Sequence, residues 1–227
     1  MKKKRTCDWF LSFSCRMIAV IFITFSALVY GQDSTGTVTD IDGNIYKTIK
    51  IGEQWWMAEN LKVSHFRNGE SIPKAIGTQE WQKAGESGAP ACCYDLKTGE
   101  RYGMLYNGHA VNDSRQLAPE GWHIPKMEEF KILLKNCGGS GKKAYNALIE
   151  GGSSGFDALL GGWRTHSGGF LTIGMEAYYW FEKNDSSIVW GTMTFSKPWK
   201  NAELMDYTYT YSKEVNYFGS SIRCLKD

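Results

Sequence analysis

Apolar residues recur with a regular spacing in the middle of the chain, between residues 121 and 137. Trp122 and Ile124 share one face of a short extended run, and the proline that follows disfavours helix at Ile124. Beyond that proline the apolar residues fall on one side of a helix, and two glutamates occupy its first turn, where the helix dipole favours negative charge. We therefore predict a strand followed by a helix that begins at about Lys126 and ends at the glycines of residues 138–139. The apolar face of this helix comprises Met127, Phe130, Leu133, Leu134 and Cys137.

The amino-terminal part alternates β-prone runs with turn residues. Turn signals at residues 42–44 and 52–54 separate three such runs, which predicts a β-meander. Within the second run Ile45, Ile49 and Ile51 share one face, and we expect that face to be buried. The three runs are residues 37–41, 45–51 and 55–61.

The remainder is rich in β-prone runs, with two shorter helical patterns. Helices are predicted at residues 79–84, around Trp81, and at residues 142–150. Residues 155–164 alternate apolar residues with glycines, which is typical of a strand that other backbone approaches closely. Three or four β-prone runs separated by turn residues complete the chain, at residues 177–182, 188–195, 205–212 and 220–225.

The first 31 residues have the pattern of an export signal. Basic residues precede a mostly apolar run at residues 17–30, and Gly31 supplies a small residue at a plausible cleavage point. The alternative is an uncleaved membrane anchor, which would require about twenty apolar residues. We expect the mature chain to begin at Gln32, to form a single domain over residues 32–227, and to be periplasmic, cell-surface or secreted.

Removing this leader changes the charge balance. The leader holds five of the 26 basic residues and one of the 24 acidic residues, which leaves 21 basic against 23 acidic residues. Nothing in that balance favours a nucleic acid or an anionic membrane as a partner.

Four cysteines remain after the leader, an even number that suggests two disulfides in an oxidising compartment. Adjacent cysteines rarely bridge to each other, because the geometry is strained. Cys92 and Cys93 would each pair with either Cys137 or Cys224, and the alternative is one bridge with two buried thiols.

Short segments in a fixed order extend over nearly the whole mature chain. They read Asp42-Gly43-Asn44-x-Tyr46, Ile51-Gly52-x-Gln54-x-Trp56-Met57-Ala58-Glu59-Asn60-Leu61, Gly103-x-Leu105-Tyr106-Asn107, Pro119-x-Gly121-Trp122-His123-Ile124-Pro125, Ser154-Gly155-Phe156, Gly161-Gly162-x-Arg164, Tyr179-Trp180 and Ser221-Ile222-Arg223-Cys224. In this combination the chain resembles the Fibrobacter succinogenes major paralogous domain. The resemblance implies an α+β, C-type lectin-like fold, in which two helices flank small twisted antiparallel sheets after the amino-terminal β-meander.

Two positions depart from the family's pattern. Members usually carry Thr or Ser before the main helix, where this chain has Lys126. A lysine cannot accept the amide hydrogen bonds of the first turn, which costs about 1 kcal/mol. Members also carry a cysteine where this chain has Ala118, so a possible partner of Cys224 is missing.

Residues with catalytic or metal-binding chemistry form no recognisable motif. None of His65, His109, His123 and His166 lies in a metalloprotease or triad-like sequence, and the setting of His123 on an apolar strand favours a hydrogen-bonded structural role. Enzymes of a related fold generate formylglycine with cysteines, but the terminal-strand position of Cys224 favours a structural role. The acidic and amide motifs with which C-type lectins bind calcium are absent, so we predict no metal and no cofactor.

The aromatic residues give the remaining functional signal. Tyr207, Tyr209 and Tyr211 alternate along one predicted strand, so their rings share a face that Trp163 and Trp199 could extend. Such rings can stack on sugars or anchor a protein partner, and the alternative is that they face the core. We therefore expect an exported, non-catalytic binding module for an extracellular glycan or cell-surface protein. The alternatives are a formylglycine-type or other cysteine-dependent enzyme, or an unrecognised hydrolase, and a structural surface or matrix protein.

Overall fold

In the computed structural model, the described residues are 34–182, 190–206 and 214–227. The chain divides into two compact units, Met1–Gln32 and Asp33–Asp227, and every described residue belongs to the second. The predicted leader lies outside the described residues, as do Tyr207, Tyr209 and Tyr211. Over the three described ranges, no helix has the length and apolar content required to cross a bilayer.

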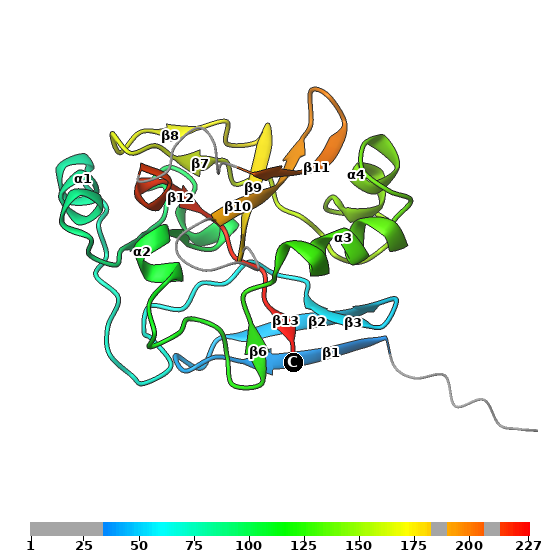
Figure 1. Cartoon of the computed structure of the whole chain (residues 1–227), viewed down its shortest axis with the longest axis horizontal. Coiled ribbons are helices and arrows are strands. Elements are labelled where there is room, and N and C mark those ends of the chain that lie inside the picture. The colour runs from blue at the N-terminus through cyan, green and yellow to red at the C-terminus, as the bar shows by residue number, and fades with distance from the viewer. Residues whose placement is uncertain (1–33, 183–189, 207–213) are drawn as a thin grey trace, which may run out of the picture. The chain divides into compact units, whose positions relative to one another are not determined.

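Three antiparallel sheets form the framework of this unit (Figure 1). The first sheet contains, in spatial order, β1 (Thr35–Thr39), β2 (Ile45–Ile51), β3 (Gln54–Met57), β13 (Leu225–Lys226) and β6 (Trp122–His123). The second contains β11 (Asn201–Asp206), β10 (Trp190–Ser196) and β9 (Glu176–Glu182). The third contains β4 (Cys92–Cys93), β5 (Leu105–Asn107), β12 (Gly219–Ser220), β7 (Trp163–Arg164) and β8 (Phe170–Leu171).

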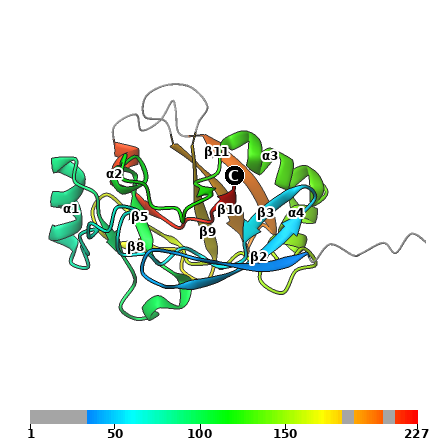
Figure 2. The ribbon, with the colours of Figure 1, turned by 90° about the horizontal axis from the view of Figure 1, so that it is seen from below.

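The named strands pair only in antiparallel fashion and the described helices form no parallel β-α-β unit, which gives an α+β fold. α3 and α4 lie beside the second sheet, and α1 lies at the opposite end of the unit, in both views (Figures 1 and 2). The described α-helices are α1 (Thr78–Ser87), α2 (Gly108–Val111), α3 (Met127–Asn136) and α4 (Lys142–Leu148), with 3-10 turns η1 (Gly99–Tyr102) and η2 (Glu214–Tyr217).

The predicted main helix is confirmed as α3. Phe130, Leu133 and Leu134 are buried on its inner face. Lys126 makes no side-chain cap, as expected, but Glu129 compensates, because its Oε2 accepts a hydrogen bond of 2.7 Å from the Lys126 amide. The helices predicted around Trp81 and at residues 142–150 are confirmed as α1 and α4.

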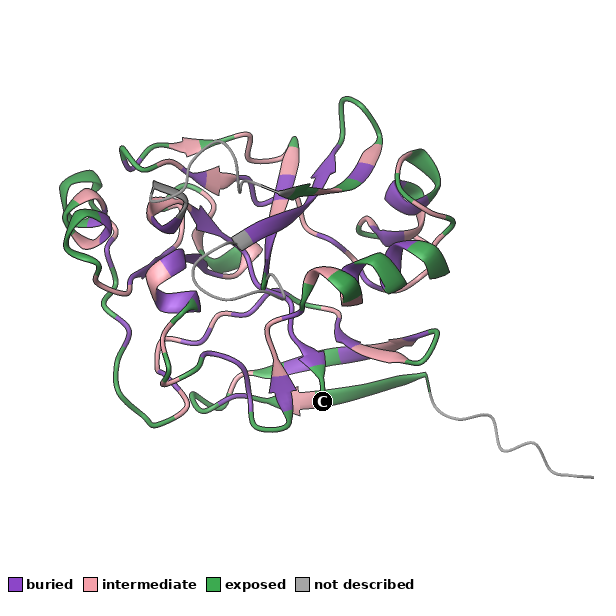
Figure 3. Ribbon diagram, viewed as in Figure 1, coloured by how far each residue is buried: buried purple, intermediate pink, exposed green. Residues whose placement is uncertain are grey.

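The β-meander is confirmed as β1, β2 and β3, and the expected burial of the isoleucine face of β2 is confirmed at Ile51 and in part at Ile49, but it is wrong at Ile45. Figure 3 colours the chain by burial, and β2 carries both buried and exposed positions. Ile45 is 64% exposed, whereas Tyr46 on the opposite face is 1% exposed. The Tyr46 hydroxyl donates a 2.5 Å hydrogen bond to Asp40 Oδ2, so this polar ring is satisfied inside one core. Ile51 packs with Phe130 in a second core, and β2 is therefore covered on both faces.

The continuous strand predicted over residues 155–164 is wrong, since within it only Trp163 and Arg164 belong to a strand, β7, and Ala158 and Gly162 form isolated bridges. Asp157 has φ +51°, which interrupts an extended run. The expected close approach of backbone does occur at Gly162, where an added Cβ would lie 2.2 Å from the carbonyl oxygen of Leu171.

Residues 219–226 link two of the three sheets. β12 lies between β5 and β7, and β13 lies between β3 and β6. Arg223, between the two strands, is fully buried. Its guanidinium donates hydrogen bonds to Asn60 Oδ1 at 2.8 Å, to the Asp157 carbonyl at 2.6 Å and to the Phe156 carbonyl.

Candidate functional site

The second sheet has two unlike faces, and its outer face forms the floor of a pocket. Residues of the inner face, such as Tyr179, pack in the same core as the buried side of α3. On the outer face, Trp180 pairs with Thr192 and Tyr178 pairs with Thr194 across β9 and β10. Alternation along the strands thus directs aromatic rings and hydroxyl groups to the same surface.

Aromatic rings from three separate segments line the walls of this pocket. The Trp163 ring lies 5.2 Å from the Phe218 ring, edge to face at 84°, and 5.9 Å from the Tyr178 ring. His166 lies 6.4 Å from Phe218. Together with the floor, these residues border a cavity of about 460 Å³, a volume within the range of small-ligand sites.

Arg164, the neighbour of Trp163 in β7, anchors this wall to the interior. Its side chain is buried and donates to the carbonyl groups of Ile76 at 2.8 Å, Gly77 at 3.1 Å and Gly168 at 3.0 Å, and to that of Ala75. Since neighbouring side chains of a strand point to opposite faces, the anchoring of Arg164 directs Trp163 toward the pocket.

The turn that follows β7 is held in one conformation by its own hydrogen bonds. Thr165 donates its amide to the Gly169 carbonyl at 2.9 Å, and Thr165 Oγ1 lies 2.8 Å from Ser167 Oγ. Gly168 has φ +85°, and an added Cβ there would lie 2.9 Å from the Thr78 Cα atom of α1. The glycine therefore allows the turn to dock closely on α1, which fixes the rim of the pocket.

The lining has a distinct chemical character. The described lining residues include no Asp, Glu, Lys or Arg side chain. Their polar groups are the hydroxyls of Thr165, Ser167, Thr192 and Ser220, together with the phenol, imidazole and indole groups of the rings. Flat apolar surfaces beside hydroxyl groups suit an uncharged ligand that has both an apolar face and hydrogen-bonding groups.

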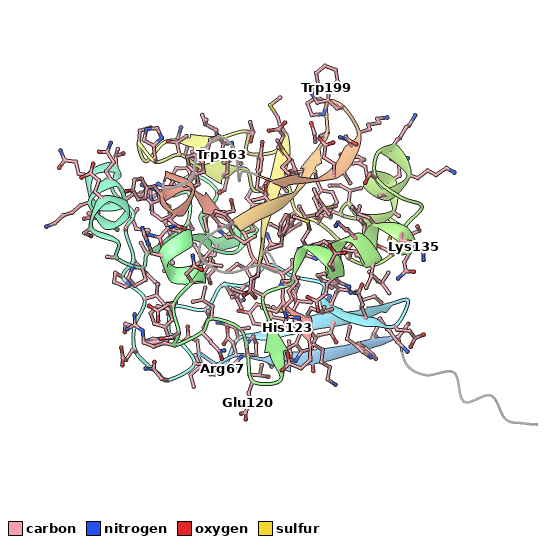
Figure 4. All side chains as sticks on the ribbon, viewed as in Figure 1. Arg67, Glu120, His123, Lys135, Trp163 and Trp199 are labelled. Atoms are coloured by element: carbon pink, nitrogen blue, oxygen red, sulfur yellow. The ribbon has the colours of Figure 1, made fainter. Side chains whose placement is uncertain are left out.

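The sequence-predicted ligand residues fall into three groups. Trp163 lines the pocket. Trp199 is absent from the described lining and instead lies at the tip of the β10–β11 hairpin, directed away from Trp163 (Figure 4). The two indoles therefore do not form the single platform that the sequence suggested. Tyr207, Tyr209 and Tyr211 lie outside the described residues.

Sequence reasoning missed Tyr178, Phe218 and His166 as parts of this site. A partial signal exists for Tyr178, because the 177–182 run carries aromatic residues at both odd and even positions, so both faces of the strand are aromatic. Phe218 and His166 lie in turns, where no periodicity indicates which way a side chain points.

All four cysteines of the described chain are free, so the predicted disulfides are not formed. Cys92 and Cys93 point to opposite sides of β4 and lie in two different cores, and Cys137 packs against a third. Cys224 shares a core with Cys92. Burial raises the pKa of Cys92 to about 12 and that of Cys93 to about 11, and it also raises the pKa of Cys224, so these groups stay protonated thiols near neutral pH.

His123 is hydrogen-bonded at both ring nitrogens, as its sequence setting predicts. Nε2 lies 3.0 Å from both Glu129 carboxylate oxygens, and Nδ1 lies 2.6 Å from Asp227 Oδ1. The hydrogen bond with Glu129, followed by that with Asp227, raises the pKa of His123. The histidine thus joins β6, the first turn of α3 and the segment after β13. It also borders a smaller polar cavity of about 330 Å³.

A second group of polar side chains combines Ser64, His65 and Asp42. Asp42 Oδ1 lies 2.5 Å from His65 Nδ1, and Oδ2 accepts a 2.9 Å hydrogen bond from Ser64 Oγ. Burial raises the pKa of Asp42, but hydrogen bonds from Ser64 and His65 outweigh it and hold the pKa below its usual value. In a catalytic triad the imidazole lies between hydroxyl and carboxylate, whereas here the carboxylate contacts both. Among the described residues, no group of three His, Cys, Asp or Glu side chains could hold a metal ion.

Comparison with known proteins identifies the family. The model of the Fibrobacter succinogenes major domain matches residues 49–226, which cover the pocket and most of the described unit. The chain therefore belongs to that family, as its sequence motifs indicate. No match to the chain was found among curated proteins or among solved structures.

Proposed function

We propose that this member of the Fibrobacter succinogenes major domain family is an exported, non-catalytic binding module whose aromatic pocket recognises an uncharged part of an extracellular glycan. The observation that carries the proposal is the pocket wall of Trp163, Tyr178 and Phe218, with hydroxyl groups between the rings. The C–H faces of a pyranose ring are flat and weakly apolar, and aromatic rings can stack on them while hydroxyl side chains exchange hydrogen bonds with the sugar.

Preorganisation supports the proposal. The carbonyl-anchored Arg164 and the hydrogen-bonded turn at residues 165–169 fix Trp163 before any ligand arrives. A fixed ring loses little conformational entropy on binding, so more of the contact energy contributes to affinity.

We also propose that the fold is C-type lectin-like. The support is the presence of helices beside small antiparallel sheets, and the inclusion of β1 and β13 in one sheet. That arrangement brings residues from both ends of the described unit into the same layer.

Export rests on the basic and apolar pattern of residues 1–31. The cleavage position is testable by expressing the full chain with its leader and sequencing the amino terminus of the protein found outside the cytoplasm. We expect that terminus to be Gln32. A product that keeps its leader and sediments with membranes would instead support the anchor alternative.

Binding in the pocket is tested by a glycan array, followed by calorimetry with the best uncharged oligosaccharide. We expect Trp163→Ala to weaken the affinity at least about tenfold, because truncation of a central aromatic contact typically costs more than 1 kcal/mol. Trp199→Ala is the matched control: it removes an indole outside the pocket and should leave this affinity unchanged. Equal binding by wild type and Trp163→Ala would refute the assignment of the pocket.

A protein ligand is the other outcome of the same design. If no glycan binds and a purified surface protein is captured by wild type but not by Trp163→Ala, the pocket is a protein-binding site and the glycan proposal is wrong.

A further inference from the structure

The turn that joins β10 to β11 carries the most exposed of the large apolar side chains described. Trp199 is 81% exposed, whereas β10 is buried from Gly191 to Ser196. An isolated exposed indole directly after a buried strand has no packing role in this chain. Its position at a hairpin tip gives a ligand free access to the whole ring (Figure 4).

The turn is nonetheless held firmly. Lys197 donates its amide to the Met175 carbonyl at 2.8 Å, and Lys200 donates its amide to the Lys197 carbonyl at 3.3 Å. Lys200 has φ +47°, a conformation that residues other than glycine rarely adopt. Such positions concentrate at functional sites, and this one lies directly after Trp199 in a turn that its backbone hydrogen bonds define.

Lysines lie in the turn beside Trp199 and at the start of the neighbouring helix α4. Lys197 and Lys200 flank Trp199 in the turn, and Lys142 and Lys143 begin α4. This helix lies beside β11, where the amide of residue 141 donates to the Ala202 carbonyl at 2.8 Å. Within the described ranges, none of these four ammonium groups forms an ion pair. The carboxylates on neighbouring strand positions are Glu203, which is exposed, and Glu176, which accepts hydrogen bonds from Tyr178 and Ser196.

From this arrangement we infer a second ligand site at residues 197–200, specific for an acidic sugar residue, in which Trp199 stacks on the ring and Lys197 and Lys200 bind its carboxylate or sulfate. The site is separate from the aromatic pocket and goes beyond the function proposed for it. A bare ring takes any sugar face, whereas flanking ammonium groups select an anion.

A sugar fits this surface better than a bilayer does. Met175, 52% exposed, and the small exposed ring of Pro198 are the apolar side chains next to Lys197, so little apolar area accompanies the indole. Stable membrane attachment requires a larger buried apolar face together with basic residues. The mature chain also has more acidic than basic residues, so an anionic membrane would attract only this local patch.

The test uses the exported protein, purified after expression of the full chain, with tetragalacturonate as the acidic probe and its fully methyl-esterified form as the uncharged match. A sulfated oligosaccharide distinguishes sulfate from carboxylate recognition, and phosphatidylglycerol vesicles provide the lipid arm. The variants are Trp199→Ala and Lys197→Gln/Lys200→Asn, in which asparagine tolerates the positive φ. Lys83→Gln on α1, at the opposite end of the unit, and Trp163→Ala in the pocket are the controls.

We expect one or both acidic probes to bind, with affinity at least about tenfold weaker in Trp199→Ala and in the double lysine variant and unchanged in both controls. The methyl ester should bind at least about tenfold more weakly than the acid. The inference is overturned if neither acidic probe binds to wild type, if Trp199→Ala binds as well as wild type while retaining its melting temperature, or if only the vesicles bind. Trp163→Ala changes the pocket but leaves the site at residues 197–200 intact. The two proposals can therefore fail independently, and the measurements show which one has failed.

Discussion

Arg164 and Arg223 are both fully buried, and in the described structure both direct their guanidinium groups to carbonyl or amide oxygens instead of carboxylates. Each also lies over aromatic rings. The Cζ atom of Arg164 is 4.7 Å from the Trp81 ring, and that of Arg223 is 4.6 Å from the Phe156 ring. The same side chain, in the same kind of environment, nevertheless serves two different regions.

The difference lies in what each arginine connects. Arg223 joins the segment between β12 and β13 to residues 156–157 and Asn60, all in the interior of the fold. Arg164 joins β7 to residues 75–77, and its immediate neighbour is the pocket residue Trp163. A buried arginine that binds carbonyl groups can therefore stabilise the whole fold or support a binding surface. Which of the two it does depends on the segments that supply the oxygens.

The largest expected effect is the loss of Arg223. Arg223→Met leaves the Phe156 and Asp157 carbonyls and Asn60 Oδ1 without their donor, and each unsatisfied buried acceptor costs about 1–3 kcal/mol. We expect the free energy of unfolding in urea to fall by about 3–5 kcal/mol. Arg101→Met is the matched control, since Arg101 is exposed and only lies over the Tyr102 ring, and it should change stability by less than about 0.5 kcal/mol.

The second prediction distinguishes the roles of the two arginines by comparing their lysine variants in stability and in glycan affinity. Arg164→Lys keeps the charge but loses the geometry that serves four carbonyl groups. We expect a smaller loss of stability, about 1–3 kcal/mol, together with weaker binding of the uncharged glycan by variants that remain folded at low temperature. Arg223→Lys should lower stability without changing that affinity. If both lysine variants bind equally well, Arg164 does not support the pocket and the comparison fails.

A third, smaller effect tests whether His123, like Arg223, stabilises the packing of the carboxy-terminal segment of the described unit. Its pKa is raised, so its stabilising contribution is present below the imidazole's unfolded pKa and is lost as pH rises through the folded value. Burial raises the pKa of Glu129, but the hydrogen bonds from His123 and from the Lys126 amide, together with the charges of both residues, outweigh burial and lower the pKa, so that contribution disappears in acid. Stability from the pair should peak between the usual pKa values of a carboxylate and an imidazole.

The measurement is urea unfolding from pH 4 to pH 9. As the pH rises toward 9, the free energy of unfolding of the wild type should fall by about 0.5–1 kcal/mol, which is the contribution of a partly exposed ion pair. His123→Gln should remove that pH dependence. A variant that keeps the full alkaline loss would assign the effect to another group.

The smallest effect is a difference in thiol protection. Cys93 lies near Arg164, whose charge and hydrogen bond act against the burial that raises the pKa of Cys93, and Cys224 follows Arg223 in the chain. Native alkylation monitored by mass spectrometry should modify the half-buried Cys137 first in every variant. Loss of the Arg164 hydrogen bond by itself raises the pKa of Cys93 and slows its reaction, but the looser packing in Arg164→Lys exposes this buried thiol more often, and we expect the exposure to dominate and speed modification of Cys93. By the same loosening, Arg223→Lys should speed modification of Cys224. Rapid alkylation of Cys224 in wild type would instead favour the cysteine-dependent enzyme alternative.

The elements that could be predicted from sequence have local causes. α3 follows from a proline, two glutamates, an apolar face and terminal glycines, all within about 18 residues. The meander follows from its turn residues. The burial of Tyr46 on the other face of β2 was not predicted and has a non-local cause, since it depends on a hydrogen bond to Asp40 and on a core built from distant segments.

The site was less predictable for the same reason. Trp163 was found by its residue type alone, but its partners come from β9 and from residues after η2. The carbonyl groups that anchor Arg164 lie up to 89 residues away in sequence, and no pattern near Arg164 marks them. Residue chemistry therefore indicated a ligand-binding surface, whereas its location depended on tertiary structure.

The placement of β12 and β13 has a consequence for biogenesis. Because β12 bridges β5 and β7, and β13 bridges β3 and β6, neither sheet can be completed until residues 219–226 have been synthesised. A nascent chain that lacks residues 219–226 retains unpaired strand edges in both sheets. It therefore cannot complete its fold, even though the preceding strands have already left the ribosome. For a polypeptide that we propose is threaded through a translocon, this delay keeps the preceding strands transport-competent until β12 and β13 are available.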